Sequence, residues 1–267
     1  MALSLSNLVR KKSDKPPRCL FYGVPGVGKS TLAAEFPNPI FLQTEDGAGN
    51  LELTTFTDKP FTKFSQFEEA IEILWGGEHD FQTVVVDSLD WLEPIIWAET
   101  CRIHSTRDKP LSTIEEFGYG KGYVAAADVW RRFFKAMNTL RDDRNMTLIY
   151  LAHEEIKKFD DPERDGYDQY RLKMNKYATD IAVENADVVG FLNYIAVIRK
   201  EKGGFNKETA KASGSGQRAL FLNQRPAFTA KNRYDMPDQL LINRGQGYAA
   251  LAPYLPGHRD AAASAAA

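Results

Sequence analysis

The segment Gly23 to Ser30 (GVPGVGKS) constrains most strongly what this chain can fold into. It matches the pattern G-x-x-x-x-G-K-[ST] at every fixed position. Glycines let such a loop turn successive backbone N–H groups toward phosphate oxygens, and a following helix directs its positive end at the same phosphates. The apolar run over residues 18–22 predicts a strand before the loop, and residues 30–36 predict a helix after it. The sequence therefore predicts a phosphate-binding loop in its usual context.

Two side chains of this loop have expected roles with a bound nucleotide. Lys29 reaches the β- and γ-phosphates as a point charge, and the Ser30 hydroxyl coordinates Mg²⁺. A glycine-rich turn without a ligand is the alternative interpretation. The candidate nucleotide-binding residues in this part of the chain are Gly23, Val24, Pro25, Gly26, Val27, Gly28, Lys29, Ser30 and Thr31.

A second strand is predicted to end in a carboxylate. Residues 83–87 (TVVVD) form a β-branched run that ends at Asp87. At the carboxyl edge of a parallel sheet, Asp87 would hold Mg²⁺ through a water. Because any buried strand can end in Asp, the prediction depends on the phosphate-binding loop that precedes it.

Hydrolysis also needs a group that orients or activates water. The glutamate that usually follows the metal-binding Asp in AAA+ proteins is absent, because Ser88 stands there. The candidate is Glu45, just beyond a strand predicted over residues 40–42. We expect that strand beside the loop strand or one strand removed, which would let Glu45 face the γ-phosphate. A solvated loop acid next to Asp46 is the alternative.

The order of predicted elements favours an α/β fold with a mostly parallel sheet flanked by helices. Apolar spacing predicts helices over residues 64–75 and 124–140, and residues 147–152 predict a fourth strand that ends at His153. Turn-rich sequence at Gly203-Gly204 and over 213–216 predicts exposed loops. Three further short strands are predicted over residues 186–200, 218–222 and 226–230.

The length of the chain and the extent of its polar ends favour one domain. The 267 residues suit one large domain or two small ones. We expect an N-terminal arm over residues 1–17, one ATPase-type domain over 18–256 and a flexible tail over 257–267.

Composition excludes several classes of protein. Thirty-four basic and thirty-six acidic residues give a formal charge of −2, which excludes a polycation that coats nucleic acid by net charge. Cys19 and Cys101 form neither a disulfide framework nor a metal site, and the histidines other than His153 show no metal-ligand spacing. No secretory signal or window of 18 apolar residues occurs, so we expect a cytoplasmic protein without a membrane partner.

These features together resemble the RecA-type ATPase core. The resemblance rests on the phosphate loop, a glutamate after the second strand, a third strand ending Asp87-Ser88, and a fourth strand ending in His153. It implies ATP rather than GTP as the nucleotide, and the guanine-reading Asn-Lys-x-Asp motif is absent. It also implies that His153 senses the γ-phosphate, whereas a histidine that caps a strand is the alternative.

A fifth feature is the segment Ala230 to Arg233 (AKNR), followed by Pro237. RecA-like recombinases and hexameric helicases use a basic–x–basic pair at such a late position to reach the γ-phosphate of a neighbouring subunit. The resemblance implies this catalytic role in trans for Lys231 and Arg233, and hence a homo-oligomer, either a ring or a filament. Two exposed cations near a loop are the alternative.

The stretch from Leu20 to Pro237 looks like the phage-encoded ATP-binding proteins of the RecA-core type, proposed as single-strand annealing recombinases. The segments FGYGKGY (117–123) and AHEEIKKFDDP (152–162) are especially similar. Compared with bacterial RecA, we expect no N-terminal polymerisation helix of comparable size and no C-terminal domain. The resemblance implies single-stranded DNA as a partner, the host cytoplasm as the location, and a phage or host single-strand-binding protein as a further partner.

RecA cores contact single-stranded DNA through loops after the third and fourth strands. The equivalents are residues 105–123 and 154–180, which combine glycines, aromatic side chains for stacking and cations for phosphate. Six basic and six acidic residues over 156–180 also suit an ordinary solvated loop. The candidate DNA-binding residues are Tyr119, Lys121, Tyr123, Lys157, Lys158, Arg171, Lys173 and Lys176.

We therefore expect an Mg²⁺-dependent ATPase that binds single-stranded DNA and promotes annealing or strand exchange as an oligomer. A small-molecule or nucleotide kinase on the same loop is one rival. The other is a nucleotide-binding structural protein, such as a partner or loader of a replicative helicase, with little turnover.

Overall fold

The structure is a computed structural model that describes residues 4, 8, 14–47, 49–162, 165–203 and 207–256. Within the strands, the side chains of 196–203 and 207–215 are not described. The predicted tail, most of the predicted arm and Gly204 of one predicted turn lie outside the described residues.

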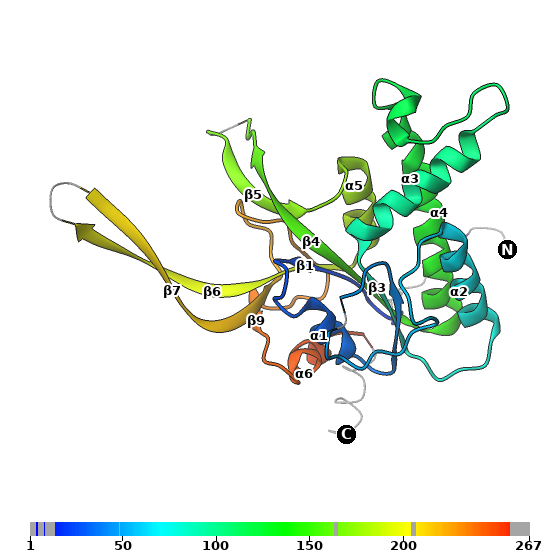
Figure 1. Cartoon of the computed structure of the whole chain (residues 1–267). Helices are drawn as coiled ribbons and strands as arrows, with labels where there is room; N and C mark the ends of the chain where they lie inside the picture. Colours follow the sequence, from blue (N-terminus) through cyan, green and yellow to red (C-terminus); the bar gives the residue numbers. More distant parts are fainter. Residues whose placement is uncertain are drawn as a thin grey trace.

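A mostly parallel sheet with the strand order β2-β3-β4-β1-β6-β7-β9 forms the centre of the protein (Figure 1). The five parallel strands are β2 (Pro39–Gln43), β3 (Thr83–Asp87), β4 (Thr147–Phe159), β1 (Arg18–Gly23) and β6 (Val188–Gly203). The antiparallel additions are β7 (Lys207–Phe221), β9 (Gln239–Leu241) and β8 (Lys231–Asn232), which pairs with the start of β6. This sheet, flanked by helices, confirms the predicted α/β fold with a mostly parallel central sheet.

The second strand does not lie where the sequence suggested. We expected β2 beside β1 or one strand removed, but both β3 and β4 separate them. The apolar part of β4 is buried on both faces and pairs in parallel on both edges, since Leu148 is opposite both Arg18 and Val84. A strand buried on both faces suits the middle of a parallel sheet, and β2 is therefore displaced outward.

Helices cover both faces of the sheet. Alternate residues of β1 point to opposite faces: Leu20 and Tyr22 join one buried cluster, and Cys19 and Phe21 join the other. On the first face the sheet packs against α2 (Phe64–Gly76), α3 (Leu89–His104), α4 (Lys121–Arg144) and α5 (Lys176–Asn185). On the second face it packs against α1 (Lys29–Ala34) and α6 (Gly247–Leu251). Two 3₁₀ turns, η2 (Ile114–Phe117) and η3 (Ala252–Tyr254), complete the described elements.

The sequence did not predict α3 or α5. Pro94 lies inside α3, and a proline within a helical pattern normally indicates its end. Leu92 and Ile96 nevertheless bury one face of this helix in the core. Burial therefore outweighs the backbone hydrogen bond that the proline removes.

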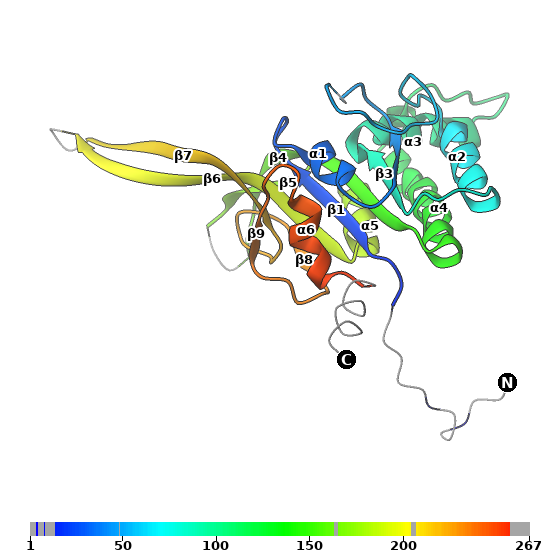
Figure 2. The same cartoon turned by 90° about the horizontal axis from the view of Figure 1, so that it is seen from below.

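Two strands continue beyond the sheet as antiparallel ribbons (Figures 1 and 2). β4 pairs with β1 as far as His153, opposite Gly23, and from Glu154 onward it pairs with β5 (Tyr167–Leu172). β6 and β7 form a second, longer ribbon with register pairs from Phe191–Phe221 to Gly203–Lys207. Both ribbons leave the carboxyl edge of the parallel sheet, the edge at which the phosphate loop lies.

These ribbons correct several sequence predictions. The fourth strand does not stop at His153, and the loop expected over 154–180 is a ribbon followed by α5. Residues 213–216 lie within β7 rather than in a turn, and 226–230 form no strand, only isolated bridges at Phe228. From Glu154 onward no side chain of β4 is fully buried, so this part of the ribbon needs no apolar alternation, and the pattern that identifies buried strands is absent from it.

The end of the predicted arm is packed against the domain. Pro16 and Pro17 are buried, and the Pro16 carbonyl accepts a 2.6 Å hydrogen bond from Arg141 Nε. Lys15 Nζ forms a 2.7 Å ion pair with Asp142. Among the described helices, none is both long and apolar enough to cross a bilayer.

Candidate nucleotide-binding site

The phosphate loop connects β1 to α1 and has the backbone conformation that its glycines predict. Gly26 and Gly28 have φ of 74° and 97°, in the left-handed region that favours glycine. At Gly23, an added Cβ would lie 2.0 Å from the carbonyl oxygen of Leu192 on β6. The loop is therefore an open cradle on its outer side and tightly packed where it leaves the sheet.

Lys29 lies beneath this cradle. Its ammonium donates to the carbonyl oxygens of Gly23 at 3.0 Å and Val24 at 3.3 Å. Burial lowers the pKa of Lys29 from its ordinary value, and the carboxylates of Asp87 and Asp90 act in the opposite direction. The loop thus holds a cation within reach of any anion that occupies it.

Ser30 and Asp87 form the pair that the sequence predicted for the metal. Ser30 Oγ donates a 2.6 Å hydrogen bond to Asp87 Oδ2. Burial raises the pKa of Asp87 above its ordinary value, and the hydrogen bond from Ser30 partly offsets this. A hydroxyl and a carboxylate beside a phosphate-binding loop suit Mg²⁺, which takes one or two protein oxygens and completes its shell with phosphates and waters. In the described ranges no group of three or more His, Cys, Asp or Glu forms a metal site by itself.

Glu45 lies in the same cleft although its strand is distant from β1. The carboxylate accepts a 2.8 Å hydrogen bond from Ser88 Oγ, directly after Asp87. The neighbouring Thr44 fixes this turn, since its hydroxyl accepts from Ser88 N at 2.7 Å and its own amide donates to Asp87 O at 2.8 Å. Parallel strands end at one edge of a sheet, so the Glu45 side chain can reach the cleft across two intervening strands.

His153 is held by α3. Asp90 accepts hydrogen bonds from both the backbone N and the ring Nδ1 of His153, each at 2.9 Å. Burial alone would raise the pKa of Asp90, but these hydrogen bonds outweigh it and the pKa lies below its ordinary value. With Nδ1 directed to Asp90, Nε2 is the ring nitrogen left for another partner. Glu45 Oε1 lies 3.8 Å from Nδ1.

The cleft that contains these groups has a volume of about 610 Å³, within the usual range for small-ligand sites. Its described lining includes three side chains that sequence reasoning missed, namely Tyr194 on β6, Arg218 on β7 and Arg244 beyond β9. Arg218 lies 191 residues from Val27, to whose carbonyl oxygen it donates a 2.9 Å hydrogen bond. The basic residue itself was visible in the sequence, but nothing local indicated that β7 returns to the loop.

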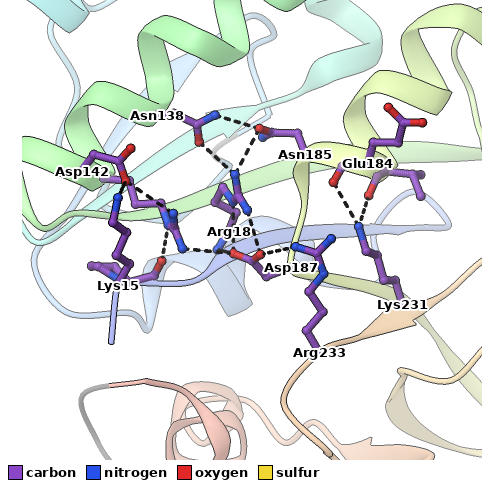
Figure 3. Close-up of polar contacts among 12 residues, drawn as sticks. Lys15, Arg18, Asn138, Asp142, Glu184, Asn185, Asp187, Lys231 and Arg233 are labelled. Carbon is purple, nitrogen blue, oxygen red and sulfur yellow. Dashed lines mark hydrogen bonds and ion pairs between the residues drawn. The ribbon is translucent and has the colours of Figure 1, made fainter. Parts of the chain in front are cut away.

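Lys231 and Arg233 are not brought to this cleft. Lys231 lies opposite Val189 near the start of β6, so both residues occupy the sheet edge opposite the phosphate loop. Figure 3 shows their partners in the same chain: Lys231 Nζ donates to the carbonyl oxygens of Val183 and Glu184, at 2.7 and 3.1 Å.

Arg233 belongs to a cluster of cations around the buried Asp187 (Figure 3). Arg233 Nη1 lies 3.0 Å from Asp187, Arg18 Nη2 lies 2.8 Å away and Arg141 Nη2 3.7 Å. Burial alone would raise the pKa of Asp187. The hydrogen bonds and charge of Arg18 outweigh this effect, so the pKa of Asp187 lies below its ordinary value. Both residues of the predicted basic pair therefore have structural contacts within their own subunit.

The DNA-binding candidates after the third strand lie around the start of α4. The Tyr119 side chain is fully exposed, and Lys121 is exposed at the first position of the helix. Tyr123 is half-buried, donates a 2.9 Å hydrogen bond to Glu115 and packs edge-on against Trp97. The Tyr119 side chain is therefore accessible to solvent, whereas Tyr123 has a structural role.

The candidates after the fourth strand lie on the β4–β5 ribbon and at the start of α5. Lys157 forms a 2.6 Å ion pair with Glu155, and the Arg171 guanidinium lies over the Phe159 ring at 5.0 Å. Lys176 lies over the Tyr177 ring at 4.9 Å. Lys158 and Lys173 are exposed. The basic side chains are thus spread along a ribbon that carries acidic residues too.

Comparison with known proteins identifies one family. The family model described as AAA domain (AAA_24) matches residues 15–234. Comparison with curated protein sequences gives no significant match. Among solved structures, the crystal structure of the RadB recombinase resembles this chain with 14% sequence identity and a TM-score of 0.45, over 86% of this chain and 90% of that one.

Proposed function

The chain belongs to this AAA domain family, and from that premise we propose that it is an Mg²⁺-dependent ATPase that binds single-stranded DNA and promotes annealing or strand exchange as an oligomer. The observation that carries the proposal is that residues from separate segments of the chain meet in one cleft. The phosphate loop, the Ser30–Asp87 pair and Glu45 come from three separate segments and line the same cleft.

Each of these residues has a distinct proposed role. The loop amides and Lys29 would bind the phosphates. Ser30 and Asp87 would hold Mg²⁺, which would supply positive charge to the reacting phosphate group. Glu45 accepts a hydrogen bond from a water and orients it. A carboxylate fixed by Ser88 keeps one geometry while its second oxygen remains available, which suits that role.

His153 is proposed to report the state of the nucleotide to the β4–β5 ribbon. It is the last residue of β4 that pairs with β1, and the ribbon begins at the next residue. The carbonyl oxygen of His153 accepts a 3.0 Å hydrogen bond from Lys173 N, on the other side of the ribbon. A displacement of His153 would therefore move the base of a segment that carries candidate DNA contacts.

The proposal also includes contact with single-stranded DNA and assembly into an oligomer. Exposed Tyr119 and the lysines of the β4–β5 ribbon support contact with single-stranded DNA by stacking and charge. Because Lys231 and Arg233 lie at the sheet edge away from their own phosphate loop, they can act on a nucleotide only in another subunit.

One experiment tests the proposed activity. Turnover of MgATP is measured with and without single-stranded DNA, for the wild type and for Lys29→Ala. We expect DNA-stimulated turnover in the wild type and none in the variant. Turnover that requires a small-molecule acceptor would indicate a kinase, and nucleotide binding without turnover would indicate a loader or structural partner. Unchanged turnover in Lys29→Ala would contradict the assignment of the phosphate loop.

A further inference from the structure

The base of the β6–β7 ribbon lies against one side of the phosphate loop. Tyr194 and Arg218 are opposite each other in the ribbon register, just before a β-bulge. Tyr194 Oη donates to the carbonyl oxygen of Gly26 at 3.4 Å, and Arg218 Nη1 donates to that of Val27 at 2.9 Å. Two consecutive residues of the loop are thus contacted by one ribbon.

Arg218 projects from a fixed backbone. The next two residues, Ala219 and Leu220, are fully buried, and the Arg218 carbonyl oxygen accepts a 2.9 Å hydrogen bond from Ile242 N. The guanidinium occupies the space beside Gly28, where an added Cβ would lie 2.1 Å from Arg218 Nη1. The cation is therefore positioned against the loop and does not sample the solvent as a free surface arginine does.

Arg218 and Asp87 lie on opposite sides of the phosphate loop. β1 has β4 and β6 as its two neighbours, and Asp87 and Glu45 lie on the β4 side of the loop. Arg218 lies on the β6–β7 side. In phosphate-loop proteins the metal ion neutralises the two outer phosphates of the nucleotide. With Ser30 and Asp87 holding such an ion, the phosphate nearest the nucleoside would lie on the other side of the loop.

We propose that Arg218 is a nucleotide-binding residue that contacts the phosphate nearest the nucleoside, from within the same subunit. The inference rests on the proposed function because it requires a nucleotide in the phosphate loop. A guanidinium has five N–H donors, and one of them is used by Val27. Among the described side chains, no carboxylate forms an ion pair with Arg218, which leaves its remaining N–H donors for a phosphate.

Substitutions that separate charge from hydrogen bonding test this role. Arg218→Gln keeps an N–H donor for Val27 but removes the charge, and Arg218→Lys keeps the charge. Arg225→Gln is the matched control, because Arg225 is an exposed arginine just past the C-terminal end of β7 and does not line the cleft. Affinities for MgADP and MgATP are measured by calorimetry at two salt concentrations, and the thermal midpoint confirms folding. Lys29→Ala is measured in parallel.

We expect Arg218→Gln to weaken MgADP and MgATP binding by the same factor, about 10- to 100-fold for a charge-assisted contact, and less at high salt. Arg218→Lys should retain most of the affinity, and Arg225→Gln all of it. In steady-state turnover, the loss should appear in KM rather than in kcat.

Equal affinities in wild type and Arg218→Gln would overturn the inference, as would a loss confined to MgATP, which would indicate a γ-phosphate contact. Equal losses in the Gln and Lys variants would assign Arg218 to shaping the loop instead. If Lys29→Ala also bound nucleotide normally, the proposed function itself would be wrong. The failure of the Arg218 role and the failure of the nucleotide site are therefore distinguishable.

Discussion

Ser88 Oγ donates a 2.8 Å hydrogen bond to Glu45 Oε1, which joins the residue after Asp87 to the carboxylate beyond β2. In the usual AAA+ arrangement a glutamate stands at the position of Ser88. Here the serine instead fixes a glutamate that arrives from another strand. The arrangement supplies a carboxylate to the cleft from a different element.

Glu45→Gln should therefore abolish most hydrolysis and spare nucleotide binding. Glutamine keeps the size and the hydrogen bond with Ser88 but is not a base, so we expect turnover to fall by about 10²- to 10⁴-fold. MgATP affinity is measured on the same sample. Ser88→Ala should give a smaller loss, because the carboxylate remains and only its orientation is relaxed. A near-normal rate in Glu45→Gln would transfer the role to another acid, such as Asp46.

The parts of the site that the sequence predicted are those whose chemistry is local. The loop from Gly23 to Ser30 is one contiguous motif, and Asp87 ends an unmistakable β-branched strand. Glu45 was predicted as a candidate from an assumed strand position that proved wrong. Glu45 nevertheless lies in the cleft, because all the parallel strands end at the same edge of the sheet.

What could not be predicted depends on long-range contacts. Nothing near Arg218 indicates that it will meet Val27, because the contact needs the whole β6–β7 ribbon to return to the loop. The part of β4 beyond His153 lacks the apolar alternation of buried strands, so its sequence resembles a loop, whereas the strands predicted over 186–200 and 218–222 overlap β6 and β7. The contacts of Arg233 with Asp187 likewise join residues with no shared local pattern.

A second prediction concerns Glu93, a buried carboxylate on α3. Both of its oxygens accept from Asn175 N at 3.0 Å, yet burial raises its pKa to about 7, from an ordinary value of 4.5. The folded state therefore holds a proton that the unfolded state loses between these values. The contribution of Glu93 to the free energy of unfolding is complete below pH 4.5 and is lost as the pH rises through about 7. The total loss is about 3 kcal/mol.

Glu93→Gln should remove that loss, because the amide stays neutral and can still accept from Asn175 N. Urea unfolding at pH 5 and pH 8 gives the free energy of unfolding of each protein. We expect the difference between the two pH values to be smaller in Glu93→Gln than in wild type. Glu72→Gln, at an exposed position of α2, is the control and should leave the difference unchanged. The same pH dependence in all three proteins would contradict this account of Glu93.

A third prediction separates charge from stacking in DNA binding. Replacing Lys157, Lys158, Lys173 and Lys176 with Ala should lower single-strand affinity and flatten its salt dependence by about 0.7 for each DNA phosphate that is no longer neutralised. Tyr119→Ala should cost about 1–3 kcal/mol with little change in salt slope, because stacking releases no counterions. Tyr119 is preferred to Tyr123, whose contacts with Glu115 and Trp97 also stabilise the fold.

Affinity is measured by fluorescence anisotropy with a labelled oligothymidine over a range of salt concentrations. Replacing Lys59, Lys63, Arg131 and Lys135 together with Ala also removes four charges and gives a control for net charge, because all four are exposed and lie outside the two candidate segments. If the control lowers affinity as much as the ribbon substitutions, DNA contact at the β4–β5 ribbon is refuted.

The last prediction tests whether Lys231 and Arg233 complete the site of a neighbouring subunit. One variant carries Lys29→Ala, and the other carries Lys231→Ala with Arg233→Ala. Asp187 keeps Arg18 and Arg141 as partners in the second variant, so we expect it to fold with a modest loss of stability, checked by its thermal midpoint. Each variant alone should be inactive.

When the two are mixed in equal amounts, a head-to-tail assembly pairs an intact loop with an intact basic pair at about a quarter of its interfaces. Turnover should therefore recover to about that fraction, and turnover per subunit in the wild type should rise with protein concentration. Absence of recovery from co-assembled, folded subunits would assign the two cations to the contacts within the chain that Figure 3 shows, and would favour the kinase reaction over a shared site.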